Sequence, residues 1–71
     1  SLEYEESMIG KNLEILLEEE VELQGKAYYL GHSREYVKVA VEKTESLKVN
    51  NLLTVKITGF TEEHILGGEL V

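Results

Sequence analysis

The chain contains no cysteine, no proline and no tryptophan among its 71 residues, and it has only seven basic side chains. Without cysteine there is no disulfide, no thiolate metal site and no ligand set for an iron–sulfur cluster. The two histidines, His32 and His64, are far apart in sequence and do not form a metal-binding set. We therefore expect no metal or cofactor site in this chain.

Long apolar runs are also missing. The longest ones span a few residues, whereas a helix that crosses a bilayer needs about 20, and no signal segment opens the chain. A chain of this length makes one domain that buries only about 60 % of the surface its unfolded form exposes. We expect a soluble, cytoplasmic monomer. Because the chain starts at Ser1 and its only methionine is Met8, we also expect a fragment of a longer protein.

Acidic residues outnumber basic ones by fourteen to seven, for a net charge of −7. This is the wrong sign for a protein held to a phosphate backbone by counterion release. The excess lies within residues 1–22, which hold eight glutamates and one lysine, so residues 23–71 are neutral overall. Six cations remain there, and a local patch rather than net charge sets local attraction.

Alternation of apolar and polar residues with period two predicts strands along most of the chain. We expect strands over residues 12–18, 26–30, 36–42, 52–58 and 67–71. Between them we expect an exposed turn over 18–25, which contains three consecutive glutamates, and a polar connection over 43–51. The short connection over 61–66 is expected to be either a loop or one helical turn. A helix is the alternative for the first strand, because Leu13, Leu16, Leu17 and Val21 also fit helical spacing.

Five short strands predict an all-β fold. Gly31 is expected to break its strand or to supply a bulge, and Gly59 to end its strand or to open a bulge. The expected architecture is a small five-stranded antiparallel OB-like barrel, because closure removes edges that so small a sheet could not protect. The predicted core is Leu13, Ile15, Leu17, Val37, Val39, Val41, Leu53, Val55 and Ile57. Residues 1–9 are predicted to be an N-terminal connector that frays, and residues 10–71 the barrel domain.

Three segments resemble the TRAM domain, the small barrel that ends the radical-SAM tRNA methylthiotransferases. A Gly10-Lys11 pair precedes a hydrophobic strand that ends in Glu18. Residues 31–39, GHSREYVKV, are similar to the glycine, polar pair, aromatic and strand pattern of the branch that modifies threonylcarbamoyladenosine. Residues 53–59, LTVKITG, and 66–71, LGGELV, resemble the family's last strands.

The resemblance implies an RNA-binding accessory domain that holds the anticodon region of tRNA. A separate catalytic domain in the parent protein would carry the iron–sulfur clusters, bind S-adenosylmethionine and perform the chemistry. The isolated domain would have no catalytic activity and no cofactor, and its partners would be tRNA and that catalytic domain. Glu35 departs from the pattern, because the branch often carries asparagine there and a carboxylate repels phosphate.

Six side chains are candidate RNA contacts. Arg34 offers planar stacking and bidentate phosphate geometry, and aromatic rings such as that of Tyr36 stack on unpaired bases. Lysines on outward strand faces follow phosphates, and a loop histidine can contact a base or a phosphate. The full set is Arg34, Tyr36, Lys38, Lys56, Tyr29 and His32. Each has a structural alternative: rim packing for the tyrosines, solvated or paired charges for the cations, and a backbone hydrogen bond for the imidazole.

Two other functions stay open at this stage. A protein-binding barrel that docks a basic partner agrees directly with the net charge. A purely structural cap on the parent's catalytic domain is the third hypothesis. We expect Ser33 to cap a local turn rather than act as a nucleophile, because no base or acid partner is evident in the sequence.

Overall fold

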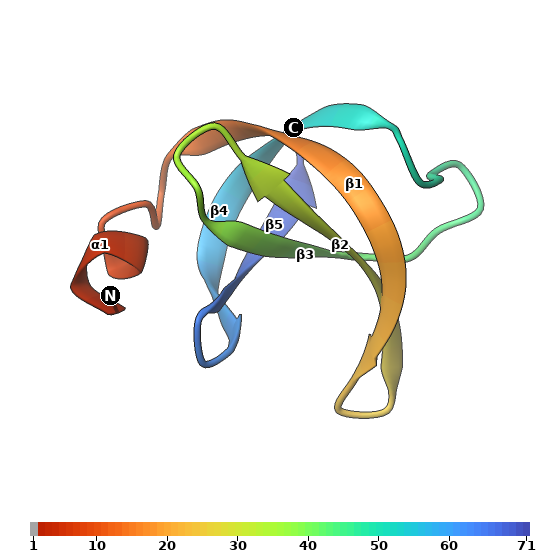
Figure 1. Ribbon diagram of the computed structural model, residues 1–71, viewed down its shortest axis with the longest axis horizontal. Coiled ribbons are helices and arrows are strands. Elements are labelled where there is room, and N and C mark those ends of the chain that lie inside the picture. The colour runs from red at the N-terminus through yellow and green to blue at the C-terminus, as the bar shows by residue number, and fades with distance from the viewer. Residues whose placement is uncertain (1) are drawn as a thin grey trace.

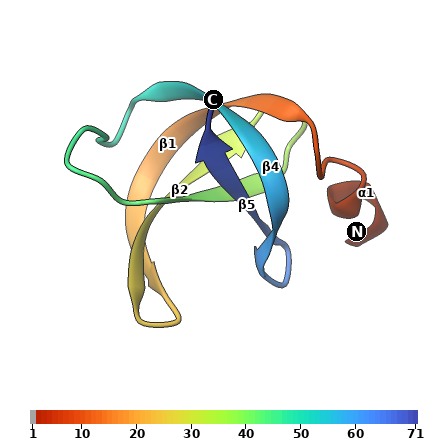
Figure 2. The same cartoon turned by 180° about the vertical axis from the view of Figure 1, so that it is seen from behind.

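The computed structural model describes residues 2–71, in which one short helix precedes five strands (Figure 1). The elements are α1 (Leu2–Glu6), β1 (Asn12–Leu23), β2 (Lys26–Ser33), β3 (Lys38–Glu42), β4 (Leu52–Glu62) and β5 (Ile65–Leu70). The strands form a single sheet that closes on itself in the order β1-β2-β3-β5-β4. The all-β prediction is confirmed, and α1 lies outside the ring in both views (Figures 1 and 2).

The sheet is mixed rather than antiparallel. Four of its contacts are antiparallel, but β3 and β5 run parallel, with Val39 opposite Leu66. The prediction of a purely antiparallel barrel was wrong for a simple reason. Directions alternate around an antiparallel sheet, and a ring with an odd number of strands cannot alternate at every contact.

The first strand is longer than its sequence indicated. β1 continues through the glutamates to Leu23, so the turn predicted for residues 18–25 is only the two-residue turn Gln24–Gly25. Both turn residues have positive φ angles, 53° and 79°, as the tight hairpin turns that suit a twisted sheet require. β1 extends this far because its first half pairs with β4 and its second half with β2. The helical alternative for residues 12–18 is excluded.

Gly31 and Gly59 both lie at irregular points of the sheet, but close packing requires glycine only at position 31. A Cβ atom on Gly31 would lie 2.3 Å from the carbonyl oxygen of Leu16, so only glycine fits where β1 presses on β2. The chain was expected to break or bulge at Gly31, but β2 runs through it and the irregularity lies opposite, in β1 between Leu17 and Glu19. The bulge predicted at Gly59 is confirmed by the register shift between Ile57 and Gly59.

The core fills the inside of the ring. Eight of the nine predicted core residues are buried, and Leu53 is partly buried against them. The structure adds Met8, Tyr29, Leu47 and Leu66 to the core. Met8, Leu47 and Leu66 come from segments that were not predicted to be strands. The sheet therefore encloses a contiguous apolar cluster, each member of which contributes on the order of 1.5–3 kcal/mol.

Other segment boundaries also differ from their predictions: β2 extends to Ser33 instead of residue 30, and β5 spans Ile65–Leu70 instead of residues 67–71. β3 begins at Lys38 instead of Tyr36, and the connection over 61–66 contains no helical turn, because β4 extends to Glu62 and a tight turn follows. Residues 2–6 form a helix rather than a frayed connector. Met8 is 6 % exposed in the core, and the Gly10 N–H donates to the carbonyl oxygen of Ile57 at 2.7 Å. The segment assigned to the connector is thus attached to the sheet, although the domain boundary at residue 10 stays a prediction.

Candidate nucleic-acid interface

The β2–β3 loop, residues 34–37, is a tightly hydrogen-bonded turn. The Tyr36 N–H donates to the carbonyl oxygen of Ser33 at 3.1 Å, and the Ser33 N–H donates to that of Val37 at 3.1 Å. The buried Ser33 hydroxyl accepts from the Glu35 N–H at 3.1 Å. The prediction that Ser33 caps a local turn is confirmed. Within these bonds residues 34–36 follow the three-residue hairpin pattern, in which the last residue, here Tyr36, has a left-handed conformation.

Tyr36 is the most exposed large hydrophobic side chain among residues 2–71, at 92 % exposure, and its φ is 65°. A left-handed conformation costs a residue with a Cβ atom roughly 1–2 kcal/mol, and bulky residues adopt it rarely. Almost no burial offsets this strain at position 36. The loop thus presents an aromatic ring to solvent in a conformation that a glycine or asparagine would adopt more easily.

Four of the six candidate contacts lie together around this loop. His32 is the next-to-last residue of β2 and is exposed, and it is the Cα partner of Lys38, which opens β3. Arg34 and Tyr36 lie between them in the loop, and all four are exposed. We refer to His32, Arg34, Tyr36 and Lys38 as the loop surface. Sequence reasoning found this group because it is nearly continuous along the chain.

The charges of the loop surface are only partly compensated. Within residues 2–71, neither Arg34 nor Lys38 takes part in an ion pair. The imidazole of His32, by contrast, contacts the carboxylate of Glu18, the residue at the bulge of β1. Glu35 forms its hydrogen bonds through its backbone N–H and carbonyl groups, and its side chain adds a negative charge to the loop. Two cations and one aromatic ring are therefore the groups available to an anionic, π-rich ligand.

The other two candidates lie elsewhere. Tyr29 points into the core at 7 % exposure, so its ring is not accessible for stacking on a base. Lys56 is exposed on β4, where its Cα partners are Asn12 on β1 and Glu69 on β5. Neither β2 nor β3 is a neighbour of β4 in the sheet, so Lys56 does not join the loop surface.

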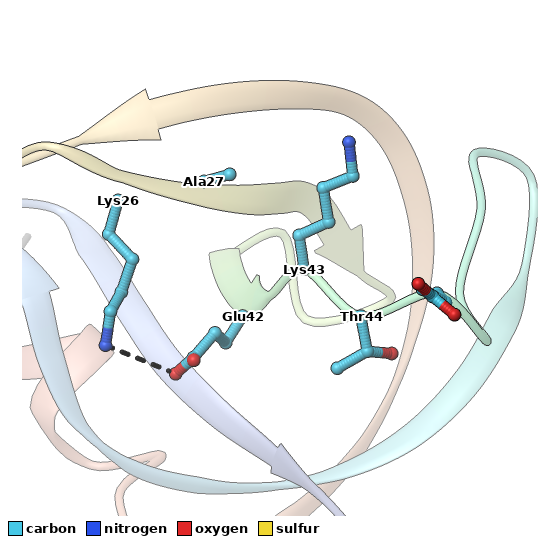
Figure 3. A pocket seen from close by; sticks show the side chains of 6 residues that line it. Lys26, Ala27, Glu42, Lys43 and Thr44 are labelled. Atoms are coloured by element: carbon cyan, nitrogen blue, oxygen red, sulfur yellow. Dashed lines mark ion pairs between the residues drawn. The ribbon is translucent and has the colours of Figure 1, made fainter.

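Lysines at the other end of β3 are paired with carboxylates. A pocket of about 350 Å³ is lined there by Lys26, Ala27, Glu42, Lys43, Thr44 and Glu45 (Figure 3). Lys26 pairs with Glu42 at 3.5 Å and Lys43 with Glu20 at 3.0 Å. The hydrogen bond from Lys43 to Glu20, supported by their charge attraction, raises the pKa of the Lys43 ammonium. The pocket therefore offers no uncompensated cation to a phosphate.

Helix α1 contacts the β2–β3 loop, which sequence reasoning did not foresee. The Tyr4 hydroxyl donates to the carbonyl oxygen of Glu35 at 2.8 Å. Next to it, Glu5 lies 2.8 Å from His64 in the turn between β4 and β5. No clear signal for these contacts is present in the sequence, because residues 1–10 are acidic and only weakly patterned.

Comparisons with known proteins identify no family for this chain, so its function has to be inferred from the loop surface. No protein-family model matches the sequence, and no curated protein matches it significantly. The helix in residues 2–71 is too short to cross a membrane, and no three potential ligands among histidine, aspartate, glutamate and cysteine gather there as a metal site.

Proposed function

We propose that this chain is an OB-like barrel of the TRAM type. Its function is to bind RNA and to position tRNA for a separate radical-SAM methylthiotransferase domain. The sequence resemblance over residues 9–71 supports the family, and the closed five-stranded sheet supports the fold. The OB-fold is a five-stranded Greek-key barrel that binds oligonucleotides on the face formed by its second and third strands. Here the loop surface lies at the end of β2 and β3.

The proposal rests on the exposed Tyr36, which lies between Arg34 and Lys38 in the chain. Neither of these two cations forms an ion pair within residues 2–71. Stacking of a base on an aromatic side chain contributes about 1–3 kcal/mol, and it does not depend strongly on the identity of the base. Arg34 has the planar geometry for bidentate phosphate contact, and Lys38 supplies a mobile point charge. Together they suit an unpaired nucleotide with its flanking phosphates, such as one in an anticodon loop.

The net charge of −7 opposes the approach of RNA, so binding rests on these few local contacts. Two phosphate contacts release few counterions. For single-stranded RNA the logarithm of the binding constant should therefore fall with the logarithm of salt concentration with a slope of about −1.4. A slope this shallow distinguishes a small contact from the extended basic patch of a generic RNA-binding protein.

Fluorescence anisotropy with a labelled anticodon stem-loop tests the proposal. We expect R34Q and K38Q each to weaken binding by roughly five- to ten-fold, the loss that follows from about 1 kcal/mol of charge-assisted hydrogen bonding. K48Q is the matched control, because it removes the same charge from the β3–β4 connection, where Lys48 has no ion pair within residues 2–71. Equal effects of all three substitutions would show non-specific attraction and contradict the proposal.

One observation favours a basic protein partner as a second candidate. Glu14, Glu19 and Glu22 are exposed along β1, and no ion pair within residues 2–71 includes them. Uncompensated carboxylates on one strand attract a cationic segment. A labelled lysine- and arginine-rich peptide in the same assay separates the two candidates. Binding of the peptide without binding of RNA, abolished by E14Q/E19Q/E22Q, would support the second.

A further inference from the structure

Helix α1 is fixed to the body of the domain at three points. Met8, just after it, lies in the core at 6 % exposure. Glu5, whose side chain is only 13 % exposed, contacts His64 in the β4–β5 turn, and Tyr4 contacts the β2–β3 loop through Glu35. Figure 2 shows α1 beside the β4–β5 turn, seen from behind. An acidic helix predicted to be a connector is thus docked against the loop that carries Tyr36.

The contact from Tyr4 falls on one particular peptide group. The carbonyl of Glu35 and the N–H of Tyr36 belong to the same planar unit, which rotates as a whole. Its N–H donates to Ser33 at 3.1 Å, and its oxygen accepts from the Tyr4 hydroxyl at 2.8 Å. φ of Tyr36 is the rotation about its N–Cα bond, and this bond leaves the planar unit at its nitrogen. Bonds that fix the orientation of the unit therefore restrict this rotation and favour the observed φ of 65°.

We propose that Tyr4 is a positioning residue for RNA binding, which holds the strained Tyr36 in the conformation that presents its ring. Strained residues persist only where the surroundings over-determine them, and Tyr4 supplies one of the two bonds that do so here. The inference rests on the proposed function, and it makes the segment before residue 10 part of the recognition unit. The substitution Y4F removes the hydroxyl, keeps the ring, and leaves the charge of α1 unchanged.

The first readout needs no RNA. Amide hydrogen exchange at Tyr36 reports opening of the loop, and exchange at Val39, in the central part of β3, reports opening of the sheet. We expect Y4F to speed exchange at Tyr36 by roughly three- to ten-fold, the effect of losing about one net hydrogen bond, with no change at Val39. S7A is the matched control, because it removes another hydroxyl hydrogen bond, from Ser7 to the carbonyl of Tyr4, without touching the loop.

The second readout is a double-mutant cycle on affinity for the anticodon stem-loop. If Tyr4 acts through Tyr36, Y4F weakens binding by roughly three- to ten-fold in the wild-type background and has no effect in the Y36A background. Equal losses in both backgrounds would mean a general structural role and would overturn the inference, as would unchanged exchange at Tyr36. If the wild-type chain does not bind RNA at all, the proposed function fails, while the exchange experiment still decides whether Tyr4 positions the loop.

Discussion

The strain at Tyr36 leads to a prediction in which two substitutions reverse their usual order. Alanine normally stabilises a folded chain relative to glycine by about 0.4–1 kcal/mol, because glycine has more freedom when unfolded. At a left-handed position a Cβ atom costs about 1–2 kcal/mol, and glycine avoids that cost. Tyr36 has φ 65° and is 92 % exposed, so the loss of its ring sacrifices little burial in either variant. We therefore expect Y36G to be more stable than Y36A by roughly 0.5–1 kcal/mol.

Urea denaturation followed by circular dichroism measures this difference. In thermal unfolding it corresponds to a Tm for Y36G that is about 2–8 °C above that of Y36A. The control pair is T54G and T54A on the exposed side of β4, where φ is not positive and the usual order should hold. If Y36G were the less stable of the two, the left-handed backbone would not be strained, and the argument that strain at Tyr36 reflects a function would be lost. Both variants should bind RNA weakly, because each lacks the ring.

Two further predictions concern the sheet and its charges. G31A should destabilise the domain by at least about 2 kcal/mol or prevent folding, because its Cβ would lie 2.3 Å from the backbone of Leu16. G59A should be nearly neutral, because its Cβ would meet nothing within 4 Å. Similar denaturation midpoints for the two variants would contradict the close contact at Gly31. For the pair between Lys43 and Glu20, the raised pKa means that its stabilisation is fully present below about pH 10.5 and is lost as the pH rises through the higher folded value. The Tm advantage of the wild type over E20Q should therefore shrink between pH 10 and 12, and a constant difference over that range would show that another interaction is responsible.

Strand alternation predicted much of the sheet, because one face of each strand is buried in a shared core. Val37, Val39 and Val41 are all buried, as their period of two indicates. The glutamate run in β1 was misread as a turn because intrinsic propensity and charge repulsion both disfavour a strand there. Hydrogen bonding to β2 overrides these local preferences, and the carboxylates remain in solvent.

Other features depend on contacts that no local pattern encodes. The parallel pairing of β3 with β5 follows from closing a ring of five strands. Tyr28 and Tyr29 are consecutive tyrosines, so residue type does not show which of them is buried. The register of β2 in the sheet places Tyr29 in the core. The role of Tyr4 depends on a hydrogen bond across 31 residues. The loop surface was predictable because its four members lie close together in the sequence. Lys56 is distant from them in the sequence, and only the strand order shows that it lies on another part of the sheet.

The most direct test is a map of amide chemical-shift changes when the labelled domain is titrated with an anticodon stem-loop. The proposal predicts that the largest changes fall on His32, Arg34, Tyr36 and Lys38 and that they weaken as salt is added. Core amides such as that of Val55 should remain unshifted. Changes confined to Glu14, Glu19 and Glu22 on β1, or found only with a basic peptide, would contradict RNA binding at the β2–β3 loop.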